Sequence, residues 1–361
     1  MKTTLSKKQN WFNRINLTKD DKLYIGVDVH KNSYAIAAWL NNAIAVDFVM
    51  PADNHQLASM LKKQRIALKK VVYEAGPTGY SLVRTLEKAK LPIQIIAPSK
   101  TPRQSAPTSK TDRLDCRKLA EYAAKGLLKP ITPPSVRQEA NRQLCRIREN
   151  IIDKQRNIKL QIKSFLLQHS IAEPDGLASW SIRSLEKLSQ IRLSSQLRYC
   201  LDIMLEQLHF LKAQLRLTEK QLCNTFAKES LDAKVKMLMT HPGIGPTIAR
   251  QFATEIFNPG RFKDKTEIAK YIGLAPMISQ SGQSLREGPI TKTGRPQLRS
   301  NLVEASWIWI RKDAHAYKTY TRILRNTGHS NKAITAMARK LAIHLWRMSC
   351  DNRPYIQGFA Q

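Results

Sequence analysis

Leu23-Tyr-Ile-Gly-Val-Asp-Val29 decides the fold of the first third of this chain. Apolar and β-branched residues dominate the stretch, which predicts a buried strand with Asp28 inside it. The polar run His30-Lys-Asn-Ser33 predicts a turn, and Tyr34–Leu40 predicts a second strand. An ionised carboxylate in an apolar strand is costly unless something pairs with it, so Asp28 is a candidate functional residue.

Further strands and helices follow in a definite order. We expect strands at Ala45–Met50, Lys70–Ala75 and Ile93–Ala97, and helices at Asn54–Lys69, at Tyr80–Ala89 and from Asp112 to about Lys125. Three strands are followed by a helix, and strands and helices then alternate. This order is that of an α/β RNase H-like sheet. In such a sheet the first strand lies beside the end of the fourth, and the last helix begins next to both.

Four carboxylates fall where this sheet would bring them together. Asp28 lies in the first strand and Glu74 at the end of the fourth. The spacing of Asp112 and Asp115 places both on one face of the first turn of the last helix. Carboxylates gathered at one site repel one another unless divalent cations neutralise them. Each could instead be a structural acid, for example one that interacts with the helix dipole.

The oxygen-only donor set predicts which cation would bind. Carboxylate oxygens select hard cations, so we expect Mg²⁺ or Mn²⁺ rather than zinc. Two such ions about 3.5–4 Å apart suit phosphoryl transfer, because they activate a nucleophile and stabilise the leaving oxygen.

The composition points to a polyanionic partner. Among 361 residues, Lys and Arg total 60 against 28 Asp and Glu, a formal net charge of +32. DNA or RNA is the expected partner. An anionic membrane surface is the alternative, but no apolar stretch approaches the roughly 20 residues of a spanning helix. The N-terminus lacks the apolar core of a signal peptide, so we expect a cytoplasmic protein, at the nucleoid when bound to DNA. No C-x-x-C pair indicates a zinc ribbon.

Several boundaries divide the chain. Residues 1–22 read as a basic lead-in that we expect to be mobile, and 23–130 as the α/β domain. Prolines in Lys129–Ser135 end that domain. Residues 136–232 read as helical, with a heptad seam from Leu197 to Leu222. That seam predicts a hairpin within the chain, a coiled coil with another subunit, or an ordinary bundle core. Residues 235–347 read as a second, mostly α domain, and 348–361 as a tail.

A turn between two helices is the first candidate DNA contact in the C-terminal half. It contains His241, Gly243 and Gly245 within Met239–Ala249, the pattern of a helix-hairpin-helix turn. Small residues there let backbone N–H groups and a helix N-terminus approach a DNA phosphate. A tight turn without a ligand is the alternative. Further on, Ser279–Ser284 reads as a Gly- and Ser-rich loop. Beyond it we predict three basic residues to contact DNA: Lys292, Arg295 and Arg299.

Taken together, these motifs resemble the DEDD-type insertion-sequence transposases, a family of bridge-RNA-guided serine recombinases related to site-specific DNA invertases. The resemblance covers nearly all of residues 23–345. In the first third it rests on Gly26–Lys31, Tyr73–Gly79 and Lys110–Asp115. In the second half it rests on His241–Gly245, Tyr271–Pro276, Gln280–Gly282, Ile290–Arg295 and Leu298-Arg299.

The resemblance implies a RuvC-like metal domain, a coiled coil, and a C-terminal transposase domain that supplies a nucleophilic serine. Carried onto this sequence, Ser281 would be that nucleophile, and the DEDD metal ligands would be Asp28, Glu74, Asp112 and Asp115. The loop reads Ser-Gln-Ser-Gly-Gln-Ser where the family has Ser-Ser-Gly-Gly, so Ser279 and Ser284 remain alternatives. A structured guide RNA that pairs with donor and target DNA is also implied.

The function expected from all of this is transposition by metal-assisted phosphoryl transfer. Ser281 lies far along the chain from the carboxylates, so the site would be composite, and we expect a dimer or tetramer as the active form. One alternative is a hydrolytic Holliday-junction-type endonuclease that uses the carboxylates and water alone. Another is a non-catalytic DNA-bridging protein.

Overall fold

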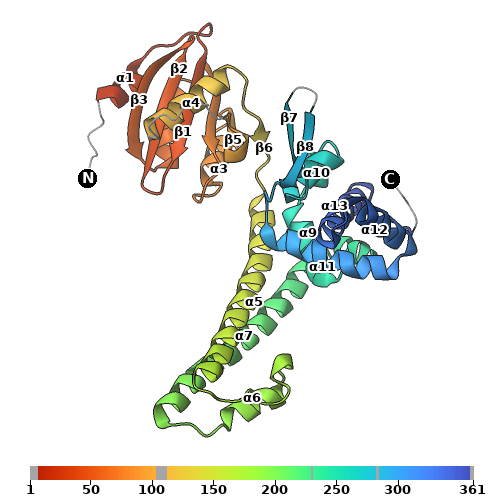
Figure 1. Cartoon of the computed structure of the whole chain (residues 1–361). Coiled ribbons are helices and arrows are strands. Elements are labelled where there is room, and N and C mark those ends of the chain that lie inside the picture. The colour runs from red at the N-terminus through yellow and green to blue at the C-terminus, as the bar shows by residue number, and fades with distance from the viewer. Residues whose placement is uncertain (1–6, 103–111, 229–230, 282–283, 358–361) are drawn as a thin grey trace. The chain divides into compact units, whose positions relative to one another are not determined.

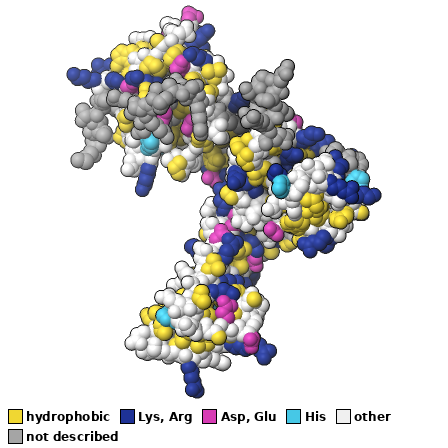
Figure 2. Space-filling view, in the orientation of Figure 1, with side chains coloured by type: hydrophobic (Ala, Val, Ile, Leu, Met, Phe, Trp, Pro, Cys, Tyr) yellow, Lys and Arg dark blue, Asp and Glu magenta, His cyan; other side chains and the backbone are white. Residues whose placement is uncertain are grey.

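The chain divides into two compact units, and the division falls between Pro133 and Pro134. This computed structural model describes residues 7–102, 112–228, 231–281 and 284–357, together with their side chains except those of residues 100, 112, 113 and 279–287. Figure 1 shows the elements of each unit. Lys and Arg side chains are spread over the visible face of both units (Figure 2), as the net charge leads one to expect.

A six-stranded mixed sheet forms the centre of the first unit. Its order is β3-β2-β1-β4-β5-β6, with β1 antiparallel to β2 and parallel to β4. This is the RNase H-like α/β arrangement that the sequence predicted, and the five longer strands lie close to their expected positions. The strands are β1 (Leu23–Val29), β2 (Ser33–Leu40), β3 (Ala43–Pro51), β4 (Leu68–Glu74), β5 (Ile93–Ile96) and the unpredicted β6 (Pro130–Ile131).

Helices cover both faces of this sheet. On one face, α2 (Asn54–Lys63) and α3 (Ser81–Lys88) pack on a core that includes Ile25 and Val27. On the other face lies α4 (Asp112–Ala124), packed against β1, β2 and β4. The short helix η1 (Pro98–Lys100) follows β5. The α2 helix ends earlier than predicted, because its last predicted residues belong to β4.

The N-terminal segment is folded where a mobile lead-in was predicted. Residues Lys7–Arg14 form α1, and Phe12 within it is 1% exposed. The Phe12 ring packs against Phe48 with ring centroids 5.7 Å apart. The Gln64 side chain donates a hydrogen bond of 3.0 Å to the Phe12 carbonyl oxygen. The prediction is therefore wrong for these residues, because one buried aromatic side chain and its neighbours hold the helix on the sheet. Residues 1–6 lie outside the described residues.

Two long helices begin the second unit and pair with each other. They are α5 (Val136–Gln168) and α7 (Ser195–Lys228), separated by η2 (Leu177–Ser179) and α6 (Ile182–Ser189). Gln155 bonds to the Leu211 carbonyl at 3.0 Å, and Arg148 bonds to Glu219 at 2.8 Å. Gln155 follows Arg148 in α5, whereas Leu211 precedes Glu219 in α7, so the two helices run antiparallel. Of the arrangements the heptad seam allowed, the structure therefore contains an antiparallel hairpin within one chain.

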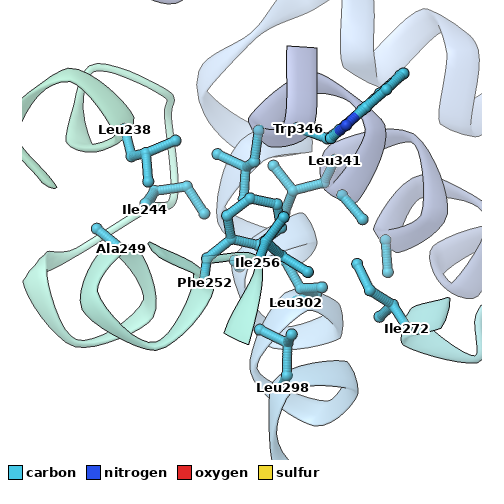
Figure 3. Close-up of a cluster of buried hydrophobic side chains, with 14 of the residues drawn as sticks. Leu238, Ile244, Ala249, Phe252, Ile256, Ile272, Leu298, Leu302, Leu341 and Trp346 are labelled. Atoms are coloured by element: carbon cyan, nitrogen blue, oxygen red, sulfur yellow. The ribbon is translucent and has the colours of Figure 1, made fainter. Parts of the chain in front are cut away.

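The rest of the second unit is a helical bundle with one small hairpin. A single core runs through it, and Phe252, Leu302, Leu341 and Trp346 meet there (Figure 3). Because Leu222 and Phe226 of α7 also belong to this core, the regions predicted as 136–232 and 235–347 share one hydrophobic interior. The elements are α8 (Leu231–Met239), α9 (Pro246–Glu255), η3 (Pro259–Arg261), α10 (Lys265–Ile272), β7 (Pro276–Ser281), β8 (Ser284–Ile290), α11 (Pro296–Lys312), α12 (Ala314–Thr327) and α13 (Ser330–Asp351).

Two predictions for this unit need correction. Residues 279–281 belong to β7 rather than to a loop, because their backbone pairs with β8. The predicted tail from residue 348 is in part folded, since α13 continues to Asp351 and Tyr355 hydrogen-bonds to Asp313. Among the helices of the described residues, none is long and apolar enough to cross a membrane.

Candidate functional site

Asp28 and Glu74 lie at the same edge of the sheet. Strands β1 and β4 run parallel with Val27 opposite Tyr73, so Asp28 and Glu74 are the next residue on each strand. Successive side chains of a strand point to opposite faces. Val27 and Tyr73 belong to the core on the α2 and α3 side. Both carboxylates therefore project toward the face that α4 covers.

The position of α4 depends on Gly26. A Cβ at this residue would overlap the carbonyl oxygen of Cys116 and lie 2.6 Å from the backbone nitrogen of Ala120. Only glycine lets the helix backbone approach β1 this closely. Burial, with a further contribution from the charge of Asp28, raises the pKa of the Cys116 thiol to about 12. Because α4 packs this closely on β1, its first turn, which holds Asp115, lies on the same face as Asp28 and Glu74.

Two neighbours orient the strand-end carboxylates. The ring atom Nε2 of His30 lies 3.2 Å from Oδ2 of Asp28, whose side chain is 25% exposed. The hydroxyl of Thr101 donates a hydrogen bond of 2.6 Å to Oε1 of Glu74. Thr101 was not among the residues predicted from the sequence. No sequence signal identifies Thr101, because it follows β5 and comes within hydrogen-bond distance of Glu74 only in the folded chain.

Carboxylate oxygens are the donors that Mg²⁺ and Mn²⁺ prefer, so the chemistry of this donor set fits such a cation. Three of the four predicted carboxylates belong to the sheet edge and the α4 face: Asp28, Glu74 and Asp115. The fourth, Asp112, is the first residue of α4, and its side chain lies outside the described residues. The part of the chain that is described contains no group of three His, Cys, Asp or Glu side chains able to hold a metal ion.

A buried carboxylate that was not predicted from the sequence lies on the edge strand β3. The side chain of Asp47 is 1% exposed and accepts hydrogen bonds from Lys8 at 2.7 Å and from Arg117 Nε at 2.6 Å. Burial alone would raise the pKa of Asp47, but these bonds hold it below its ordinary value. Asp47 thus joins α1, β3 and α4. Its sequence signal, an acid inside an apolar strand, is the same as that of Asp28.

The structure places His241 in the core, contrary to its prediction as a DNA contact. It is 1% exposed, with ring centroids 4.2 Å from Tyr355 and 4.9 Å from Trp309. Burial lowers the pKa of His241 to about 3, so the ring is neutral at physiological pH. A shielded, uncharged ring cannot contact a phosphate, and the prediction is wrong for this residue.

The two glycines of the same turn have different roles. Gly243 has φ +87°, and a Cβ there would overlap the Ala305 carbonyl oxygen. Its lack of a side chain therefore lets the turn pack on α11. Gly245 is the N-cap of α9, and no atom lies within 4 Å of a Cβ built there. Open backbone at a helix N-terminus can approach a phosphate, so Gly245 remains a candidate contact.

Both predicted arginine contacts are occupied within the protein. Arg295 forms an ion pair of 2.6 Å with Glu149, which is 8% exposed and also accepts a bond of 2.6 Å from Gln251. Arg299 donates to the carbonyl oxygens of Thr293 and, at 3.3 Å, Ile272. These arginines therefore hold the loop after β8 in place. Lys292 is exposed and remains a candidate DNA contact.

Ser281 is the last residue of β7, and its backbone pairs with Ser284 at the start of β8. Its side chain and residues 282–283 lie outside the described residues. The base of this hairpin is fixed to the end of α10. The backbone nitrogen of Lys292 bonds to the Gly273 carbonyl at 3.2 Å, and a Cβ on Gly273 would lie 2.5 Å from Thr293 nitrogen.

Two family models match the chain. One, described as a transposase with a DEDD domain, matches residues 25–171, and the other, described as "Transposase IS116/IS110/IS902 family", matches residues 235–321. With the RNase H-like sheet and its strand-end carboxylates, these matches define the class: the chain is a transposase, an enzyme of DNA phosphoryl transfer. It belongs to the IS110/IS116/IS902 family, with a DEDD N-terminal domain followed by that family's C-terminal domain.

Similar proteins come from several bacteria. The chain is 27% identical to y4qE of Sinorhizobium fredii, a protein named as a transposase, over 91% of this chain and 89% of that one. It is 26% identical to the transposase of insertion sequence element IS1533 of Leptospira borgpetersenii, over 79% and 85%. The pilin gene-inverting protein of Moraxella bovis is 29% identical over 35% of this chain and 39% of its own.

Proposed function

We propose that this transposase excises and inserts its insertion sequence by metal-assisted phosphoryl transfer, with Ser281 as the nucleophile. The observation that carries the proposal is the pair Asp28 and Glu74. They lie at the same end of two adjacent parallel strands and project toward the face covered by α4. A carboxylate pair there matches the needs of a cation that neutralises a phosphate.

Four carboxylates would hold Mg²⁺ or Mn²⁺: Asp28, Glu74, Asp112 and Asp115. Two bound ions would supply positive charge where negative charge develops on the phosphate oxygens. The residues next to these carboxylates would hold them in position. His30 restrains Asp28, and Thr101 restrains Glu74, so that the oxygens keep one geometry in the absence of substrate.

The serine step balances without an external energy source. The Ser281 hydroxyl oxygen attacks a DNA phosphorus, the phosphorus bond to a DNA oxygen breaks, and a DNA hydroxyl leaves with a proton. The resulting phosphoserine ester retains the phosphoester bond. A second DNA hydroxyl then attacks the ester, which rejoins the DNA and restores the serine. The sequence has no G-x-x-x-x-G-K-[ST] phosphate loop, consistent with a reaction that needs no ATP.

The partners follow from the same proposal. We expect donor and target DNA as substrates and a structured guide RNA that pairs with both. A dimer or tetramer would be the active form, acting in the cytoplasm on nucleoid DNA. The excess of basic residues suits binding to both polymers.

An excision assay with purified protein, Mg²⁺, guide RNA and element-flanking DNA tests the proposal. We expect Asp28→Asn, Glu74→Gln and Ser281→Ala each to lower excision at least 100-fold, and the surface control Asp20→Asn to leave it unchanged. Cleavage by Ser281→Ala at the wild-type rate would instead identify a hydrolytic endonuclease. Salt-sensitive DNA binding without any cut, in the presence or absence of Mg²⁺, would identify a bridging protein.

A further inference from the structure

The last two helices, α12 and α13, carry basic residues without acidic ones. Between Asp313 and Asp351 the sequence contains no Asp or Glu. The same segment holds seven cations: Lys318, Arg322, Arg325, Lys332, Arg339, Lys340 and Arg347. The family model for the C-terminal domain ends at residue 321, so most of them lie beyond that match.

The two helices pack into a hairpin that turns these cations outward. Gly328, with φ +66°, ends α12, and Tyr320 bonds to Ser330 across the turn at 3.1 Å. Apolar residues such as Ala333 and Met337 fill the side that faces the core. Five of the cations are exposed: Lys318, Arg322, Arg325, Lys332 and Arg347. Figure 2 shows dark blue side chains over this part of the unit.

Cations from three helices lie near Lys340 in this cluster. Lys340 of α13 is half-buried, and burial lowers its pKa, with the charges of Arg322, Arg339 and Lys265 adding to the effect. Lys265 is the first residue of α10, which packs against α13. Three cations from three helices, Arg322, Arg339 and Lys265, therefore lie within electrostatic reach of Lys340.

Little within the protein balances this charge. Among the seven cations of the hairpin, only Arg347 forms an ion pair with an acid of the described residues, at 3.8 Å from Asp351. Like charges at short range repel, which destabilises the folded state unless an anion binds. A bound polyanion would neutralise these charges and relieve the repulsion between them.

We infer that seven residues form a surface that binds the phosphate backbone of duplex DNA: Lys265, Lys318, Arg322, Arg325, Lys332, Arg339 and Lys340. This basic hairpin surface rests on the proposed function, because the substrate of a transposase is DNA. Its charge complements duplex DNA, which carries one negative charge per roughly 1.7 Å of helix axis. The helix α13 has 22 residues and so spans about 33 Å, which matches many consecutive phosphates. Backbone contacts of this kind position the protein on DNA without reading its sequence.

Fluorescence anisotropy with the full chain and a random-sequence 30-bp duplex tests this surface. The affinity is measured from 50 to 300 mM salt for wild type and for Arg322→Gln/Lys340→Gln. Each lost phosphate contact reduces the salt slope by about 0.9, so the slope should fall by about 1.8. Binding at 100 mM salt should weaken at least tenfold. The melting temperature should stay equal or rise, because two repelling charges are gone. The control Lys163→Gln/Lys236→Gln removes two lysines of the same unit that are paired with Glu173 and Asp232. Its slope should remain within 0.3 of wild type.

A second variant, Lys318→Gln/Arg325→Gln, changes only exposed residues of α12 and cannot unfold the core. An unchanged slope in both double variants would overturn the inference, as would an equal loss in the control. A loss confined to duplex or single-stranded RNA of the same length would assign the surface to RNA and overturn the DNA assignment. Binding by Ser281→Ala separates this question from catalysis, since that variant should bind DNA with the wild-type salt slope even if the serine proposal fails.

Discussion

Arg117 on α4 donates hydrogen bonds to Asp47 on β3, a carboxylate whose side chain is 1% exposed. The same carboxylate accepts a bond from Lys8 on α1. Together with the close approach of α4 to Gly26, this pair ties the helix that carries Asp115 to two strands of the sheet. The position of α4, and with it the carboxylate face of the first unit, therefore depends in part on this ion pair.

Replacing Asp47 should destabilise the protein. Asp47→Ala removes the shared partner of Lys8 and Arg117, and hydrogen bonds to charged groups contribute about 1.5–3 kcal/mol each. Both cations are half-exposed and can turn to water, so we expect a total loss of about 1.5–3 kcal/mol, measured by urea unfolding. Asp20→Ala, an exposed change, should stay within about 0.5 kcal/mol of wild type. Equal stability of the two variants would show that Asp47 does not anchor the fold.

The stabilisation by Asp47 should also depend on pH. Because its pKa is held below the ordinary value, its contribution is complete above about pH 4, the unfolded value. It is lost as the pH falls through the lower, folded value. The difference between wild type and Asp47→Ala should therefore be constant from pH 7 to 5 and shrink below pH 4. A difference that grows on acidification would contradict the assignment.

Gly26 should tolerate no side chain. In Gly26→Ala the new methyl group overlaps the α4 backbone, and overpacking of this kind costs about 1–3 kcal/mol. Displacement of α4 should also lower excision activity. The matched control is Gly76→Ala, because no atom lies within 4 Å of a Cβ built there. Thermal unfolding of both variants gives the comparison. Equal melting temperatures would contradict a close contact between Gly26 and α4.

Arg295 and Lys292, three residues apart, should have separable effects. Arg295→Ala leaves Glu149 buried without its cation and should cost about 1.5–3 kcal/mol of unfolding free energy. Lys292→Ala should leave stability unchanged but reduce the salt slope of DNA binding by about 0.9, as expected for one phosphate contact. Denaturant unfolding and anisotropy titrations of both variants give the comparison. The reverse pattern would restore Arg295 as a DNA contact.

His241 should make stability fall on acidification. Its pKa of about 3 in the folded state lies below the unfolded value of about 6.5, so below pH 6.5 the unfolded chain binds an extra proton. Stability should fall toward pH 5 by up to about 1.4 kcal/mol per pH unit from this residue. His241→Gln should remove that part of the slope, while His344, whose pKa burial also lowers, keeps its own. An unchanged slope in the variant would mean that the ring is not buried in solution.

Except for α1 and β6, local patterns in the sequence were sufficient to predict the elements of the first unit. Its strands alternate with helices of clear period, so the order of elements and the edge shared by Asp28 and Glu74 could be predicted. The same reasoning could not distinguish Asp28 from Asp47. Both are acids in apolar strands, and only the tertiary position of Lys8 and Arg117 shows that Asp47 has an internal partner.

Predictions of DNA contacts in the second unit were less successful for a similar reason. A basic side chain in a Gly-rich segment indicates a phosphate contact only if no buried acid lies near it in space. Arg295 meets Glu149, which is 146 residues away in the sequence, and no local pattern reveals that pairing. The β7–β8 hairpin was also missed, because Ser279-Gln-Ser281 is polar and lacks the alternation that marks a strand.

The most direct test of the central claim is a search for DNA covalently attached to Ser281. Protein, guide RNA, Mg²⁺ and element-flanking DNA are incubated, denatured, trimmed with nuclease and analysed by peptide mass spectrometry. We predict a nucleotide on the peptide containing Ser281, absent from Asp28→Asn and from Ser281→Ala. An adduct on Ser279 or Ser284 would keep the mechanism and move the nucleophile. Cleaved DNA with no adduct on any serine would contradict the serine mechanism.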